Sequence, residues 1–188
     1  MKKFAMIVLF LAQGALAKTQ TDTGAATLRT VPGQGQVNFE AVGKPSFMKI
    51  RGEGEGVRGE VRVGKTIEGT FQFNLETLKT GISLRDRHMK EKYLEIEKFP
   101  KAELQIVSVD KFDPALATLQ STPFKGNLVI HGVTKPVIGT AKIEKTAKGY
   151  KVQAQFDAKI SDHTIGVPSY AGVTVADVVK VEVQTDLM

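Results

Sequence analysis

Residues 150–160 read YKVQAQFDAKI, and this stretch decides the fold class of the chain. Every second residue from Tyr150 to Ile160 is apolar, and the residues between them are lysine, glutamine or aspartate. Successive side chains of a strand point to opposite faces of a sheet. This period of two therefore predicts a strand with one buried face and one wet face.

The same alternation recurs along most of the chain. Apolar residues or glycines occupy alternate positions in residues 37–41, 57–63, 67–75, 102–106, 124–130, 137–143 and 179–183. We expect about eight strands in an all-β fold, and they should be antiparallel because no strand–helix–strand pattern of a parallel sheet is present. Antiparallel strands with one wet face close into a barrel or pack as two sheets.

Two segments depart from this pattern. Residues 83–94 contain no glycine, proline or β-branched residue and predict one short helix across an end of the barrel. We expect Ser83 to cap this helix, and Asp86 to lie favourably near its positive end. Residues 51–56, RGEGEG, are interpreted as an exposed turn or bulge and not as a cation site, because no aspartate-rich loop accompanies them.

The first residues predict export. Lys2 and Lys3 precede an apolar run, and Ala15 and Ala17 are small residues of the kind that signal peptidase recognises. We therefore expect residues 1–17 to be a signal peptide that is cleaved after Ala17, and the mature protein to be periplasmic or secreted. Residues 18–34 are interpreted as a flexible leader, and residues 35–188 as one barrel domain.

Composition limits the partners. The chain has a net charge of +6, but its basic residues do not cluster among aromatic residues as in a nucleic-acid interface, so we expect no nucleic-acid partner. A transient contact with an anionic membrane surface is compatible with this charge. The chain contains no cysteine, which excludes disulfides and thiolate metal sites, so the core alone must hold the fold.

The inward positions of the predicted strands carry no charge, and many are glycine or alanine. Small residues leave room for an apolar ligand, but packed barrels also alternate large and small residues, so both alternatives stay open. If a cavity exists, we expect the following residues to contact its ligand: Phe39, Phe71, Phe73, Met89, Tyr93, Leu104, Phe124, Ile130, Ala154, Phe156 and Ala158.

No catalytic or metal site is predicted. His88, His131 and His163 have no metal-ligand spacing. Ser161, Asp162 and His163 are the residue types of a hydrolase triad, but as neighbours on a strand they would point to opposite faces. Residues 85–88, RDRH, are interpreted as a charge network on the helix surface.

Several motifs resemble the YceI-like family. They are LRDRHM at residues 84–89, YLE at 93–95, KFP at 98–100, GNL at 126–128 and HGVTKPV at 131–137, and they follow one another in the family's order. The resemblance implies an exported, lipocalin-like antiparallel barrel that binds a polyisoprenoid or an isoprenoid quinone in its interior. It implies no catalytic residue and no cofactor other than such a bound lipid.

Two classes of function follow. The first is a carrier of a long apolar lipid, which the resemblance favours. The second is a barrel without a stable cavity that acts as an exported stress-response or partner-binding protein. An enzyme, such as a hydrolase, is a distant third hypothesis because no nucleophile motif is present.

Overall fold

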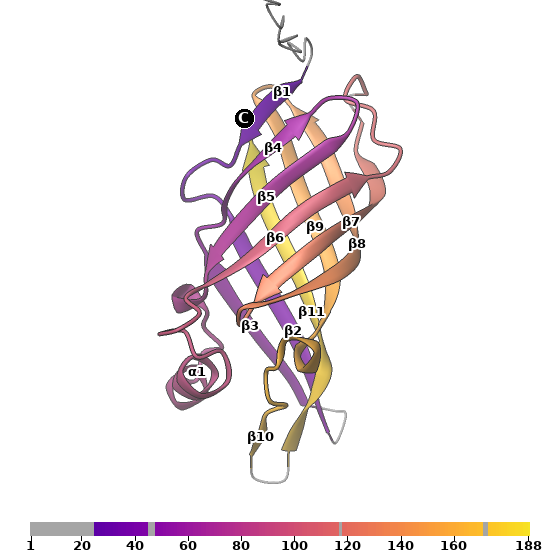
Figure 1. Cartoon of the computed structure of the whole chain (residues 1–188). Coiled ribbons are helices and arrows are strands. Elements are labelled where there is room, and N and C mark those ends of the chain that lie inside the picture. Colours follow the sequence, from indigo (N-terminus) through magenta and orange to yellow (C-terminus); the bar gives the residue numbers. More distant parts are fainter. Residues whose placement is uncertain (1–24, 45–47, 117, 171–172) are drawn as a thin grey trace, which may run out of the picture.

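The computed structural model describes residues 25–44, 48–116, 118–170 and 173–188. It shows an antiparallel sheet that curls around an apolar interior, with a short helical segment at one end (Figure 1). The predicted signal peptide, residues 1–17, lies outside the described residues, as does the first part of the predicted leader. None of the helices in the described part of the chain has the length and apolar character of a membrane-spanning segment.

Within the described residues the sheet contains eleven strands, and most of them were predicted from the period of two. Neighbours along the sheet follow the order β1-β4-β5-β6-β7-β8-β9-β11-β2-β3, and β10 pairs with β11. The strands are β1 (Ala26–Arg29), β2 (Gln36–Lys44), β3 (Met48–Glu55), β4 (Arg58–Val63), β5 (Ile67–Asn74), β6 (Lys101–Val109), β7 (Gln120–Ile130), β8 (Val133–Thr146), β9 (Gly149–Lys159), β10 (Ser169–Tyr170) and β11 (Val173–Leu187).

Two sequence interpretations of the N-terminal half are wrong. Part of the predicted leader, Ala26–Arg29, is strand β1 and pairs with β4. The predicted turn at residues 51–56 belongs mostly to β3, where Gly52 pairs with Phe39 and Gly54 with Val37 of β2. Its glycines and glutamates alternate because they point to opposite faces of the sheet.

Each edge strand of the curled sheet is hydrogen-bonded to another part of the chain: β1 to the end of β11, and β3 to the segment after β5. At the upper end of Figure 1, Arg29 and Met188 exchange two backbone hydrogen bonds of 2.7 and 2.9 Å. At the lower end, Glu53 of β3 and Lys79 exchange two more of 2.9 and 2.8 Å. These bonds satisfy backbone groups that an open sheet edge would leave free. The predicted antiparallel barrel is thus confirmed, with more strands than expected.

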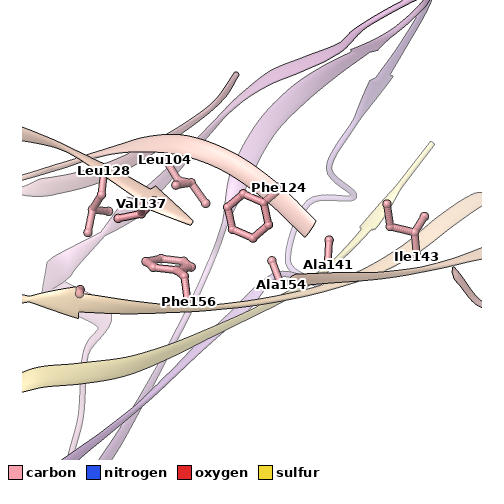
Figure 2. Close-up of a cluster of buried hydrophobic side chains, with 9 residues drawn as sticks. Leu104, Phe124, Leu128, Val137, Ala141, Ile143, Ala154 and Phe156 are labelled. Atoms are coloured by element: carbon pink, nitrogen blue, oxygen red, sulfur yellow. The ribbon is translucent and has the colours of Figure 1, made fainter. Parts of the chain in front are cut away.

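Two groups of buried side chains fill the interior. The wall cluster lies on β6–β9 and includes the rings of Phe124 and Phe156, which face each other edge to face at 6.2 Å (Figure 2). The end cluster lies nearer the lower end, and it joins Val57 and Phe73 to side chains from the connecting segments, such as Leu94. The wall cluster comprises Leu104, Phe124, Leu128, Val137, Ala141, Ile143, Ala154, Phe156 and Ala158; the end cluster comprises Val37, Val57, Phe73, Leu75, Leu78, Leu94 and Ile165.

Inward glycines accommodate the phenylalanine rings. Phe39 pairs with Gly52, Phe71 with Gly59 and Phe124 with Gly139, each across two neighbouring strands. A Cβ atom on Gly139 would lie 2.5 Å from Cε1 of Phe124, and one on Gly59 would lie 2.8 Å from Cδ1 of Phe71. The small inward residues therefore hold aromatic rings and do not simply leave empty space.

The connection from β5 to β6 holds the helical segment. It contains η1 (Leu75–Thr77), the α-helix α1 (Ser83–His88) and the π-helical turn η2 (Met89–Tyr93). Ser83 begins α1 but does not cap it, since the cap residue is Ile82, which makes no side-chain cap bond. Asp86 instead accepts hydrogen bonds from the backbone and hydroxyl of Thr80.

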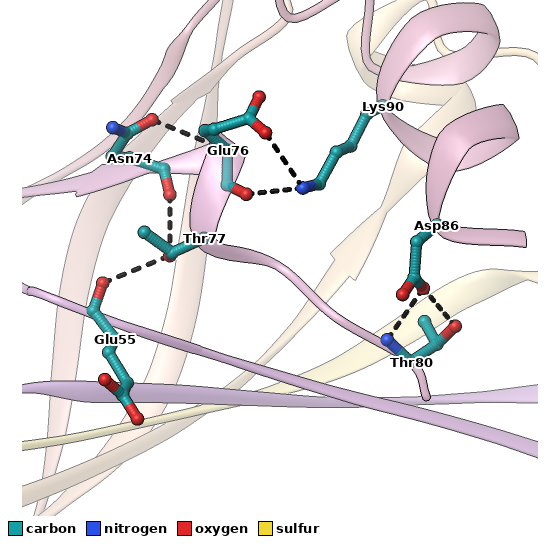
Figure 3. Close-up of polar contacts among 7 residues, drawn as sticks. All are labelled: Glu55, Asn74, Glu76, Thr77, Thr80, Asp86 and Lys90. Carbon is teal, nitrogen blue, oxygen red and sulfur yellow. Dashed lines mark hydrogen bonds and ion pairs between the residues drawn. The ribbon is translucent and has the colours of Figure 1, made fainter. Parts of the chain in front are cut away.

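Polar contacts fasten this connection to β3 and join its helical turns to one another (Figure 3). The Thr77 hydroxyl donates to the Glu55 carbonyl over 3.1 Å, and Lys90 reaches from η2 to the carboxylate of Glu76 over 3.1 Å. The helix predicted at residues 83–94 is present as α1 and η2, and its second half is a π-helical turn.

The glycine–ring pairing predicts the outcome of a matched pair of substitutions. We expect Gly139→Ala to lower the free energy of unfolding by about 1–3 kcal/mol, because the new methyl group overlaps the Phe124 ring and the neighbouring backbone. Gly166→Ala is the control, since a Cβ atom there meets nothing within 4 Å. Urea unfolding of both variants measures the difference, and equal stabilities would contradict the steric account.

Candidate functional site: an apolar cavity in the barrel

A cavity of about 140 Å³ lies between the two core clusters. Aliphatic and aromatic residues of both clusters border it, including Val37, Phe73, Leu128 and Ile143. It extends toward the upper end of the barrel, where Ile67, Val109 and Leu187 border it from the ends of their strands.

The structure brings together part of the predicted ligand site. Ala154 borders the cavity from β9, on the same face as Phe156. Six of the predicted residues border this cavity: Phe71, Phe73, Leu104, Phe124, Ala154 and Phe156.

The other predicted residues lie elsewhere in the interior. Met89, Tyr93 and Phe39 pack against the end cluster. Ile130 packs against both clusters, and Ala158 is a member of the wall cluster. Since neither Met89 nor Tyr93 borders the cavity, the helical segment is part of the packed lower end and does not cover the cavity's upper end.

Sequence analysis missed several residues of the lining. Thr185 and Leu187 border the cavity, and they continue the alternation that was recognised only up to Val183. Val57 also borders it and is 2% exposed, although it lies outside the strands, between β3 and β4. The alternation could have revealed the first two had it been followed beyond Val183, and the alternation in residues 57–63 already placed Val57 on the inner face.

The surface that faces the cavity is apolar, although Gln72, Glu103 and Thr185 are among the residues that line it. Among the described residues, every buried side-chain nitrogen or oxygen has a hydrogen-bond partner. Burying an unpaired polar group costs a few kcal/mol, so the cavity selects an apolar ligand. A dry apolar cavity of about 150 Å³ can hold a molecule as large as benzene, so the present cavity accepts a short apolar group.

A polar cluster at the lower end unites residues of the sequence motifs. Nε2 of His131 donates to the Glu95 carboxylate over 2.8 Å, and its Nδ1 lies 3.1 Å from the Thr164 hydroxyl. Phe99 stacks on the His131 ring with centroids 4.4 Å apart. Glu95, His131 and Thr164 all have positive φ angles, which non-glycine residues adopt only where surrounding contacts hold them. The cluster thus ties three chain turns together.

Charged neighbours stabilise the ionised form of Glu95. A hydrogen bond from Lys98, followed by that from His131, lowers the pKa of the Glu95 carboxyl group below its usual value. The Lys98 ammonium lies 2.6 Å from this carboxylate.

The residues of the triad type have other partners. Ser161, Asp162 and His163 lie in the 3₁₀ helix η3 (Ile160–His163), so the prediction that placed them on a strand is wrong. The Ser161 hydroxyl donates to Asp177 over 2.6 Å, and this bond lowers the pKa of the Asp177 carboxyl group. His163 is buried, with its Nδ1 3.0 Å from the Val133 carbonyl.

The charged residues of α1 bind the chain that precedes the helix. Arg85 donates to the hydroxyl and the carbonyl of Thr80, each over 2.7 Å, and Asp86 accepts from the same residue. These side chains therefore position the helix. Across the described residues, no group of three histidine or acidic side chains is arranged to hold a metal ion.

Comparison with known proteins identifies the family. The profile of the YceI-like domain matches residues 29–187. The chain belongs to the YceI-like family. This match covers β2 to β11 and every residue of the cavity lining, whereas no curated protein matches the sequence.

Solved structures share the fold of this YceI-like chain. BcnA of Burkholderia cenocepacia superposes with a TM-score of 0.65 at 12% identity, covering 82% of this chain and 96% of that one. A polyisoprenoid-binding domain from Saccharophagus degradans gives 0.65 at 14%, covering 85% and 97%. The YceI protein of Campylobacter jejuni gives 0.53 at 16%, covering 74% and 86%. At these identities the likeness establishes the fold alone.

The Glu95 cluster predicts a pH-dependent effect on stability. At neutral pH we expect Glu95→Gln to lower the Tm, because the variant loses the charge that holds Lys98 and His131. The folded-state pKa of Glu95 is lowered, so its contribution is lost as the pH falls through that value. The Tm difference between the two proteins should therefore shrink in acid.

The control is Glu91→Gln on the same helical segment, because Glu91 is exposed and makes no ion pair within the described residues. Thermal unfolding followed by circular dichroism across a pH series gives the Tm values. A Tm difference for Glu95→Gln that stays constant from neutral to acidic pH would contradict the role of the carboxylate.

Proposed function

We propose that this protein binds the chain of an isoprenoid lipid, such as a polyprenyl lipid or an isoprenoid quinone, inside its barrel. The observation that carries the proposal is the cavity between two core clusters, which is bordered by phenylalanine rings and presents an apolar surface to its ligand. The family and the structure described as a polyisoprenoid-binding domain support it. The protein acts as a carrier and not as an enzyme.

A long chain needs more volume than the cavity has at present. Pockets for ligands of drug size occupy about 300–1,000 Å³, several times the 140 Å³ found here. The Phe71 and Phe124 rings lie over Gly59 and Gly139 and border the cavity, so their displacement would lengthen it. The polar head of the lipid stays at the rim, because the surface that faces the cavity is apolar.

The setting for this activity is outside the cytoplasm. Residues 1–17 have the charge and apolar pattern of a signal peptide. The chain contains no cysteine. A periplasmic or secreted carrier would keep an insoluble isoprenoid out of water between membranes.

One observation favours a second candidate function. The cavity is small because rings already fill the space above several glycines. A barrel that stays in this packed state would act without a ligand, as an exported stress-response or partner-binding protein.

Two alanines of β9 distinguish these functions. Ala154 and Ala158 are equally buried at 8% exposure, but only Ala154 borders the cavity. We expect Ala154→Leu to leave the stability of delipidated protein unchanged or higher, because the new side chain enters the cavity. Ala158→Leu overpacks the wall cluster and should cost on the order of 1–3 kcal/mol.

Binding of a fluorescent farnesyl analogue gives the second readout. The wild type should bind it, and Ala154→Leu should bind it at least about tenfold more weakly because the ligand has lost its volume. A further control, Ile138→Ala on the outer face, should bind like the wild type, since Ile138 is 71% exposed. No binding by the delipidated wild type, together with no lipid in an organic extract of the native protein, would contradict the carrier function.

A further inference from the structure

The upper end of the barrel combines three features around the cavity. The loop between β6 and β7 lies at one side of this end, in contact with residues of the β8–β9 turn, and Ile67, Val109 and Leu187 carry the cavity lining toward it. We call the described parts of that loop and turn, residues 110–116, 118–119 and 145–151, the upper rim.

Side-chain contacts hold the loop against the turn. The Phe112 ring meets the edge of the Tyr150 ring with centroids 5.9 Å apart, and it packs against the wall cluster. Lys145 and the Tyr150 hydroxyl donate to the Pro114 carbonyl over 3.2 and 3.4 Å. Few contacts thus position the loop at this end of the cavity.

Two large aliphatic side chains of the same loop face solvent. Leu116 is 49% exposed and Leu119 is 60% exposed, although Phe112 of the same loop is packed inward. Exposed aliphatic residues next to a cavity mouth are typical of surfaces that meet another apolar phase.

The rim also carries free positive charge. Lys111, Lys148 and Lys151 are exposed, and within the described residues neither they nor Lys145 has a carboxylate within ion-pair distance. At the lower end, Lys90, Lys98 and Lys159 pair with Glu76, Glu95 and Asp162, but Lys79 and Lys92 make no ion pair within the described residues.

Four carboxylates lie among or beside the rim lysines. Asp113 accepts a hydrogen bond from the Ala115 backbone, and Lys151 lies between Glu144 and Asp186 in the strand register. The fourth is Asp110. With Lys142 included, five lysines face these four carboxylates, so the excess of positive charge at the rim is small.

We propose that the upper rim docks on the surface of an anionic lipid bilayer. Leu116 and Leu119 enter the apolar boundary, while Lys145, Lys148 and Lys151 lie among the phosphate groups. Exposed apolar side chains flanked by lysines bind such a surface through apolar burial and charge attraction together. This inference rests on the proposed function, because it supplies the route by which an isoprenoid passes from the bilayer to the cavity.

Vesicle flotation of the delipidated protein tests the docking directly. Most of the protein should float with vesicles of phosphatidylcholine mixed with phosphatidylglycerol. A much smaller fraction should float with vesicles of phosphatidylcholine alone. The variant Lys145→Gln/Lys148→Gln/Lys151→Gln should bind the anionic vesicles about tenfold more weakly or worse. The variant Leu116→Ser/Leu119→Ser should also lose binding, and salt should weaken the wild type.

The matched control lies at the opposite end of the barrel. Ile82 and Leu84 are about as exposed as the rim leucines, at 53% and 47%, so Ile82→Ser/Leu84→Ser should leave vesicle binding unchanged. An equal loss in this control, or no loss in the rim variants, would overturn the proposal. A wild type that does not bind anionic vesicles would also overturn it. So would a wild type that sediments as a dimer, if the rim substitutions convert it to a monomer without weakening vesicle binding.

Binding of the farnesyl analogue in vesicle-free solution separates the two proposals. Rim variants that still bind the analogue but not the vesicles support docking as a step distinct from binding in the cavity. If the wild type binds anionic vesicles through the rim but does not bind the analogue, the docking stands and the carrier function fails.

Discussion

The pairing of a phenylalanine ring with a glycine on the neighbouring strand determines the interior of this barrel. Phe39 lies over Gly52, Phe71 over Gly59 and Phe124 over Gly139, and in each case the two residues are partners in the strand register. A ring that covers a glycine buries its apolar surface and packs where a Cβ atom could not fit. The register, the core packing and the small remaining cavity all depend on these pairs.

The sequence predicts a strand where apolar and polar residues alternate within the strand itself. Residues 150–160 show it clearly, and β9 occupies most of them. Residues 51–56 hide it, because the inward positions are Gly52 and Gly54 and the rings that cover them come from Phe39 and Phe73. Hydrophobic periodicity registers only a residue's own side chain, so a strand whose buried face is supplied by other strands resembles a turn.

The candidate site shows the same limit. Alternation places Phe71, Phe124 and Ala154 in the interior, and all three border the cavity. It cannot distinguish Ala154 from Ala158, because which of two inward alanines meets empty space depends on side chains from other strands. The helix at residues 83–94 was predicted from its composition, yet its packing against the end cluster depends on contacts distant in sequence. The local alternation therefore indicates the strands and their inner face, whereas the volume of the cavity depends on side chains from many strands.

Fluorine NMR of the protein labelled with fluorophenylalanine tests the central claim that an apolar chain displaces these rings. Titration of the delipidated protein with farnesol should shift the resonances of Phe71 and Phe124, the rings that lie over glycines beside the cavity. The Phe99 resonance should not move, because that ring stacks on His131 in the lower polar cluster. Saturating farnesol that leaves the Phe71 and Phe124 resonances in place would contradict the account.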